Sequence, residues 1–217
     1  MPTATQRAYA KIRKSILTGK FPSGSHLGED DIAEYCNTSR TPARHAIAQL
    51  ASEGLVTVRS NGRSYVSDMT IEHFEEMFDV MSMLESYSAG LAAERITKQQ
   101  MDELKAISDT LAEASRGPYN EKLLLELNSQ FHKAIHISSG NNRLNELVLQ
   151  VVDFPHIVYL KFGDTGSSHN EDALWEHAQI AQALAAGDRD HAALMMRVHT
   201  EAVRRRAREL WQGKEDG

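Results

Sequence analysis

The fold is decided by the stretch TSRTPARHAIAQL, residues 38–50. It suits a helix start, because Ser39 or Thr41 can cap a helix and Pro42 fits the first helical turn. Beyond the start, apolar and polar side chains alternate with helical spacing, which predicts one face that packs and one that touches a polar partner. The packing face comprises Ala43, Ala46, Ile47 and Leu50, and the polar face comprises Arg40, Thr41, Arg44, His45 and Ala48.

Residues on either side complete a small domain. Before the stretch, helical spacing predicts a helix of about 15 residues that stops at Gly19 and a short helix over residues 29–35. After it, alternating residues around Asn61-Gly62, which tolerate a positive φ, predict a β-hairpin over residues 56–66. Three helices and a hairpin within about 65 residues form the order of a winged helix-turn-helix, a DNA-binding architecture.

The rest of the chain is predicted to be helical, with no strand signal. The expected fold class is therefore mainly α, with a winged helix-turn-helix over residues 1–68 and an all-helical bundle over residues 69–217. Breaks divide the bundle into about six helices. They fall at Thr97, Gly117-Pro118, Gly140-Asn141-Asn142, Gly163 to Ser168 and Gly187-Asp188.

Charge is unevenly divided between the two predicted domains. The chain carries a net charge of -6, yet residues 1–68 contain 9 basic and 6 acidic residues, and the remainder contains 15 and 24. Residues 1–68 have a net charge of +3 and could face the phosphates of DNA, whereas the remainder has a net charge of -9 and would be repelled by them. The late run Arg204-Arg205-Arg206, with Arg208, is interpreted as a solvated helix end.

Several protein classes are not favoured by the sequence. No stretch approaches the roughly 20 apolar residues that a membrane-spanning helix needs, so no membrane partner is expected. Residues 1–14 lack the features of a secretory signal, and the single Cys36 cannot form an internal disulfide, so a cytoplasmic location is expected. Neither a glycine-rich phosphate loop nor a nucleophile elbow is visible.

The polar face of the helix over residues 40–52 is the first candidate site. Arg40 and Arg44 lie one turn apart, so both could enter a major groove, one on a phosphate and one on a guanine edge. A hairpin tip with two cations suits the minor groove or its phosphates, and the alternative is an ordinary solvated surface. The expected wing contacts are Arg59, Asn61, Gly62 and Arg63.

Histidines form the second candidate site. Three of the 10 histidines, His132, His177 and His199, are predicted to face inward from three different helices. Neutral imidazoles are common zinc ligands, and facing helices of a bundle can each donate one. Asn128 could add a carbonyl oxygen, whereas His136 is predicted to drift toward the polar edge of its helix. The alternative is that each histidine is an ordinary core residue.

Two segments carry a resemblance to a known family. Ser39 to Leu50, followed by Glu53-Gly54-Leu55-Val56, strongly resembles the recognition region of GntR-family regulators. The segments NSQFH at 128–132, Glu176-His177 and MRVH at 196–199 resemble the metal-binding pattern of the FadR-type C-terminal domain called FCD. The six predicted C-terminal helices, rather than seven, resemble the VanR branch.

The resemblance implies a homodimeric transcription regulator, usually a repressor, that binds a double-stranded DNA operator and responds to a small carboxylate in its helical domain. It implies that a divalent metal, zinc with nickel or manganese as alternatives, lies at the floor of the effector pocket. The implied metal ligands are Asn128, His132, His177 and His199, and the implied effector contacts are Met81, His132, His177 and His199.

Four positions depart from the family pattern. Asn128 stands where aspartate is commoner, which removes one negative ligand and should weaken metal binding or alter the metal preference. Asp30 stands where many relatives have an arginine and His45 where a glutamate is usual, which indicates an unusual operator. Met81 replaces an arginine that pairs with the effector carboxylate, so either the metal and histidines bind the acid alone or the effector is less anionic.

Two other functional classes can be set against a regulator. A metal-dependent enzyme acting on a small organic acid would use the same histidines, but it would also need a buried acid or base that the sequence does not identify. A scaffold protein would explain the bundle but not Arg40, Arg44 and the wing. We therefore expect a regulator that is not an enzyme, with the metal-dependent enzyme as the alternative.

Overall fold

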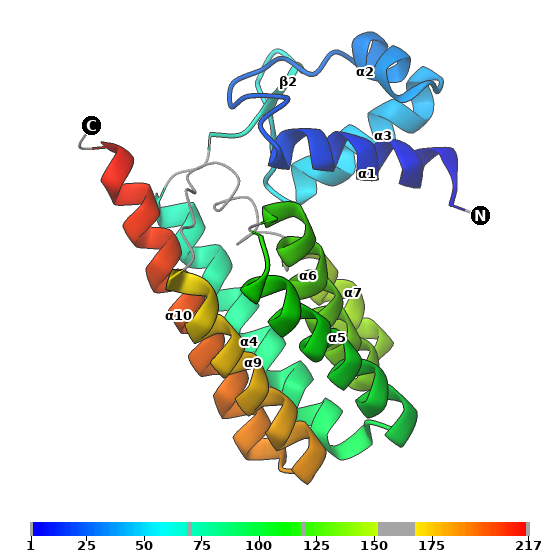
Figure 1. The fold of residues 1–217 in the computed structure, drawn as a ribbon. Helices are drawn as coiled ribbons and strands as arrows, with labels where there is room; N and C mark the ends of the chain where they lie inside the picture. Colours follow the sequence, from blue (N-terminus) through cyan, green and yellow to red (C-terminus); the bar gives the residue numbers. More distant parts are fainter. Residues whose placement is uncertain (1, 69–70, 119, 152–167, 216–217) are drawn as a thin grey trace. The chain divides into compact units, whose positions relative to one another are not determined.

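The computed structural model describes residues 2–68, 71–118, 120–151 and 168–215. These residues form two compact units, one within residues 1–70 and the other within residues 71–217. Figure 1 shows a small unit of helices with a hairpin and a bundle made of helices alone. In the described ranges, no helix is both long enough and apolar enough to span a membrane.

The first unit has the predicted order of three helices and a hairpin. The two strands pair antiparallel, with Val56 opposite Val66 and Val58 opposite Ser64. The fold expected from the sequence, a helix-turn-helix with a small wing, is confirmed. The elements are α1 (Ala4–Leu17), α2 (Glu29–Cys36), α3 (Arg40–Ser52), β1 (Val56–Val58) and β2 (Ser64–Val66).

Local interactions set where these helices begin and end. Helix α1 begins with a capping box, in which the Thr3 hydroxyl accepts from the Gln6 backbone and the Gln6 side chain accepts from the Thr3 backbone. Helix α2 ends because Asn37 takes the left-handed conformation at φ 51°. Ser39, one of the two expected caps, begins α3, although its side chain makes no cap hydrogen bond.

The wing turn differs from the expected use of Asn61-Gly62. Gly62 takes a positive φ of 77°, whereas Asn61 is not among the positive-φ residues of the described chain. Arg59 N donates to Arg63 O at 2.9 Å, so three residues form the loop, and Asn61 Oδ1 accepts from Arg63 N at 3.0 Å. Asn61 thus closes the turn with its side chain rather than with its backbone conformation.

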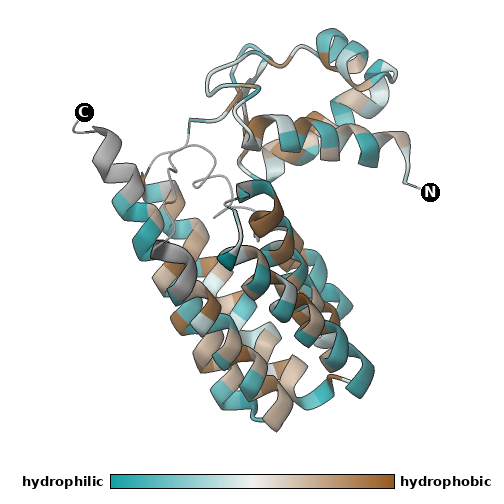
Figure 2. Ribbon diagram, viewed as in Figure 1, coloured by the Kyte–Doolittle hydropathy of each residue, from teal (hydrophilic) through white to brown (hydrophobic). Residues whose placement is uncertain are grey.

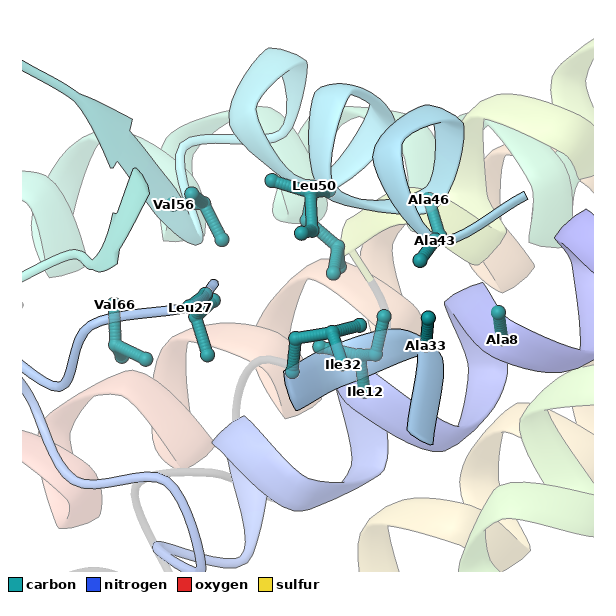
Figure 3. Close-up of a cluster of buried hydrophobic side chains, with 11 residues drawn as sticks. Ala8, Ile12, Leu27, Ile32, Ala33, Ala43, Ala46, Leu50, Val56 and Val66 are labelled. Carbon is teal, nitrogen blue, oxygen red and sulfur yellow. The ribbon is translucent and has the colours of Figure 1, made fainter. Parts of the chain in front are cut away.

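A single apolar core holds the first unit together. Figure 3 shows Ala43, Ala46 and Leu50 of α3 facing Ile12 of α1 and Ile32 of α2. All four residues of the expected packing face of α3 are buried, and all five of its expected polar face are exposed. The helix is therefore fixed on one side and open to solvent on the other.

The described part of the second unit contains six helices, and it contains no strand. The expected breaks at residues 97, 117–118, 140–142 and 187–188 are confirmed. The expected break at 163–168 falls on residues 152–167, which lie outside the described residues. The helices are α4 (Ile71–Arg95), α5 (Lys98–Arg116), α6 (Glu121–Ser138), α7 (Asn142–Val151), α9 (Ser168–Ala186) and α10 (Arg189–Glu215).

Helix α4 is the centre of this bundle, because it contacts α6, α7, α9 and α10. It packs tightly against α10 at Gly90, where an added Cβ would lie 3.2 Å from the Arg189 carbonyl oxygen. Brown and teal residues alternate along the bundle helices in Figure 2, as expected for amphipathic helices that bury one side. The polar residues that face inward from α4, α6, α9 and α10 are therefore enclosed by the bundle and shielded from solvent.

Candidate functional site

The first candidate site is the exposed face of α3, which we call the reading face and define as Arg40, Thr41, Arg44 and His45. All four residues are exposed. The side chains of Arg40 and Arg44 are 67% and 59% accessible to solvent. The structure therefore brings these predicted residues together on one open helix surface, with the opposite side of α3 anchored in the core.

Both arginines of the reading face are paired with carboxylates from the first turn of α2. Arg40 binds Asp30 with two nitrogens, Nε to Oδ1 and Nη2 to Oδ2, the latter at 2.6 Å. Arg44 Nε lies 3.2 Å from Glu29 Oε1. These pairs were not predicted from the sequence, because they depend on how α2 crosses α3 and follow no local spacing.

The wing presents its predicted residues at the surface. Arg59, Asn61, Gly62 and Arg63 are all exposed. The Arg59 guanidinium lies over the Tyr65 ring, 4.0 Å from its centroid, and the ring thus fixes the position of this cation. A held cation at a hairpin tip is suited to contact with phosphate or with a groove.

The second candidate site is a cluster of three buried histidines. His132 on α6, His177 on α9 and His199 on α10 are 6%, 2% and 3% exposed, so their expected burial is confirmed. Their ring centroids are between 4.7 and 5.4 Å apart. One ligand atom of each lies within 4.8 Å of the others, so the three imidazoles could hold a metal ion.

Two buried carboxylates orient this cluster, and no role was predicted for either of them from the sequence. His132 Nδ1 lies 2.8 Å from Glu85 Oε2, and His199 Nδ1 lies 2.7 Å from Glu176 Oε2. A neutral imidazole that donates from Nδ1 leaves Nε2 as a lone-pair donor, the arrangement found behind metal-ligating histidines. The carboxylates therefore prepare His132 and His199 as ligands.

His177 gives the most direct test of whether a metal fits. Both of its ring nitrogens are buried and have no hydrogen-bond partner within the described part of the chain. Its ring stacks on Phe131 with centroids 4.3 Å apart. A buried polar atom without a partner is costly, and a metal ligated by one of these nitrogens would satisfy it.

His136 corrects an expectation from the sequence. It was predicted to lie toward the polar edge of its helix, but it is 1% exposed, because both α4 and α5 pack against α6 and cover more of its circumference. His136 Nδ1 lies 3.1 Å from Ser88 Oγ. Together with Glu85 and His132, it forms a second buried group whose ligand atoms lie within 4.8 Å of one another.

The arginine run of α10 is a second correction. Arg204 pairs with Glu75 and Asp79 of α4, and Arg206 is buried and pairs with Glu176 through Nη2 at 3.2 Å. The interpretation of this run as a solvated end is therefore wrong for these two residues. Their partners lie on other helices, so local sequence could not identify them.

Two further predicted site residues lie on helices that carry His132 or its partner Glu85. Asn128 is half-buried on α6, one turn before His132, and Met81 is buried on α4, one turn before Glu85. Their assignments as a metal ligand and an effector contact remain predictions.

Burial favours the neutral forms of His177 and His199 by lowering their pKa values, and nearby histidines keep Glu85 ionised by lowering its pKa. Burial, followed by the nearby His199, His132 and Arg206, lowers the pKa of His177 well below its ordinary value. Burial also lowers the pKa of His199, against the opposing effect of Glu176. Burial raises the pKa of Glu85, but the charge and hydrogen bond of His132 outweigh it and bring the pKa to about 2. These are the protonation states that metal binding requires.

Two family models match the chain. One, described as bacterial regulatory proteins of the gntR family, matches residues 4–66, and the other, described as the FCD domain, matches residues 76–202. The second match alone spans more than half of the chain. The reading face lies within the first match, and the three clustered histidines lie within the second.

Individual proteins agree with these matches. The chain is 27% identical over 195 residues to a probable D-xylose utilization operon transcriptional repressor of Paenarthrobacter nicotinovorans, covering 88% of this chain and 83% of that protein. It is 24% identical over 213 residues to the HTH-type transcriptional repressor RspR of Escherichia coli strain K12, covering 97% and 92%. The solved structure of E. coli McbR/YncC has the same fold, with a TM-score of 0.78, 22% identity and coverage of 99% and 100%.

The buried histidines make stability depend on pH. Burial lowers the pKa of His136 to about 4 from an ordinary value of 6.5, so the unfolded chain takes up a proton that the folded chain refuses between these pH values. In protein freed of metal by a chelator, the free energy of unfolding should fall as pH falls through this window. His136→Gln should remove about 2 kcal/mol of the loss between pH 6.5 and pH 5.

Urea denaturation at a series of pH values measures this effect. The matched control is His191→Gln, which replaces an exposed histidine of α10 and should leave the slope unchanged. If the free energy of unfolding falls with pH equally in the wild type and in His136→Gln, His136 is not a source of the pH dependence.

Proposed function

Because the chain belongs to the GntR family of bacterial regulatory proteins and carries an FCD domain, it is a DNA-binding transcriptional regulator, and we propose that it is a repressor controlled by a small organic acid. We infer that this acid binds beside a divalent metal in the second unit. The observation that carries the proposal is the convergence of three buried imidazoles from three helices, two of them oriented by carboxylates. The repressor RspR and the probable D-xylose utilization operon repressor, both similar to this chain, support the sign of the response.

The first unit contacts DNA through the reading face and the wing. Arg40 and Arg44 are the candidates for guanine edges in the major groove, because guanidinium donors match the acceptors of guanine. Thr41 and His45 lie beside them, and the wing residues Arg59, Asn61, Gly62 and Arg63 contact phosphate or the minor groove. A regulator of this kind acts on the chromosome, so its site of action is the cytoplasm.

The second unit holds the metal through His132, His177 and His199, with the side-chain oxygen of Asn128 as a fourth ligand. Three imidazoles favour zinc, with nickel and manganese as alternatives. When bound, the metal supplies positive charge and open coordination positions for the carboxylate of an effector. The protein residues hold those positions in place, and Met81 contributes an apolar wall in place of a cation.

The regulator acts as a homodimer that binds an inverted-repeat operator, with one reading unit of the dimer on each half-site. An exposed apolar face on the packed pair α4 and α10 is the surface that we assign to the second copy. It contains residues at helical spacing, of which Met83 is 65% exposed. The residues of this apolar face are Val80, Met83, Tyr87, Leu194 and Val198.

The effector changes DNA affinity to the extent that it binds one arrangement of the dimer better than another.

Removal of one reading-face cation should weaken DNA binding. Arg44→Ala is expected to lower affinity for a duplex from the promoter region of the protein's own gene by about tenfold to a hundredfold, because one good contact to a base is lost. Fluorescence anisotropy at fixed salt measures this change. Arg116→Ala, which removes an exposed arginine of α5, should bind like the wild type, and equal affinities for all three proteins would remove the assignment of α3.

Removal of one histidine should abolish the response to metal. Zinc at a hundredfold excess over its dissociation constant stabilises a protein by about 2.7 kcal/mol, so it should raise the melting temperature of the wild type but not of His177→Ala. His191→Ala, altered at an exposed position, should respond like the wild type. A screen of small organic acids with and without zinc then identifies the effector. A fully metal-loaded and responsive His177→Ala protein would show that the histidines are ordinary core residues.

A charge placed in the apolar face should separate the two copies. Met83→Asp is expected to convert the dimer to monomers at micromolar concentration, because an unpaired carboxylate would be buried in the interface. Sedimentation velocity measures the change. Ala178→Asp introduces the same charge at an exposed position of α9 and should remain dimeric. A dimeric Met83→Asp protein would place the interface elsewhere.

A further inference from the structure

The two arginines that are expected to read DNA are already engaged when no DNA is present. Arg40 and Asp30 form a two-point pair, and Arg44 Nε lies 3.2 Å from Glu29 Oε1. All four side chains are well exposed, with accessibilities from 44% to 67%. The pairs therefore lie on the surface that meets the duplex and are not part of the core.

This arrangement cancels the charge of the reading face. Two guanidinium groups face two carboxylates, so an approaching phosphate meets as much negative as positive charge. Affinity for arbitrary DNA comes mostly from cations on phosphates, and a carboxylate held beside each cation opposes it. The first unit should accordingly bind an arbitrary backbone less well than its two arginines alone would suggest.

The two carboxylates hinder arginine contacts with base edges less than they hinder arginine contacts with phosphates. A guanidinium group has five N–H donors, and the contacts with Asp30 occupy only one from Nε and one from Nη2 of Arg40. The remaining edge, formed by Nη1 and Nη2, can still donate two hydrogen bonds to the O6 and N7 acceptors of guanine. Guanine carries no charge there, so the neighbouring carboxylate repels it far less than it repels a phosphate.

We propose that Glu29 and Asp30 are positioning residues that determine specificity: they suppress binding of Arg40 and Arg44 to phosphate and turn the free edges of both guanidinium groups toward guanines. This inference rests on DNA binding by α3. Since exposed ion pairs contribute little to stability, variants at these positions should fold normally.

The test compares two duplexes. The first is a 24-base-pair duplex of random sequence, and the second is a duplex of the same length selected from a randomised library by the wild-type protein. The double variant Glu29→Gln with Asp30→Asn should bind the random duplex about tenfold more tightly and with a steeper dependence on salt. Its affinity for the selected duplex should change by less than about threefold, so the ratio of the two affinities should fall.

Two further proteins separate positioning from general charge. Glu34→Gln removes one negative charge from an exposed position of α2, and it should keep the wild-type ratio. Asp30→Glu keeps the carboxylate and should also keep the ratio. The inference is overturned if the double variant retains the wild-type ratio, or if Glu34→Gln lowers the ratio as far as the double variant does. Failure of the wild type to bind any duplex would instead overturn the DNA-binding role of α3.

Discussion

The second unit depends on one constraint, which is that the ring nitrogens of three imidazoles enclosed by helices must find partners. Glu85 and Glu176 meet part of this demand by accepting from Nδ1 of His132 and His199. Both carboxylates are themselves buried, so each needs the hydrogen bond that it receives. His177 lacks such a partner within the described residues, and a cation bound by the cluster would supply one.

The periodicity of the sequence predicted which side of each helix is buried, because this depends on one helix alone. The faces of α3 followed from the spacing of Ala43, Ala46, Ile47 and Leu50, because one side of a helix repeats every third or fourth residue. The inward direction of the three clustered histidines followed in the same way, each from its own helix. Membership of the family was indicated by motifs that sit on these same faces.

Sequence could not predict what depends on two helices at once. Glu85 resembles an ordinary charged residue until α6 brings His132 to it, and the pairing of Arg206 with Glu176 joins α10 to α9. His136 was misplaced for a related reason, since the number of neighbours around α6 decides how much of its surface is covered. Charged residues with a partner across the bundle are therefore the group that periodicity describes least well.

The three imidazoles lie on α6, α9 and α10, so the ribosome adds them to the chain one after another. On the ribosome, the DNA-reading unit is synthesised before the bundle, and His199 is synthesised after His132 and His177. A nascent chain that stops before residue 199 lacks the third imidazole, so a cation held by all three histidines would be acquired after the reading unit has been synthesised. Metal bound by all three histidines would then be found only in chains whose α10 has been synthesised through His199.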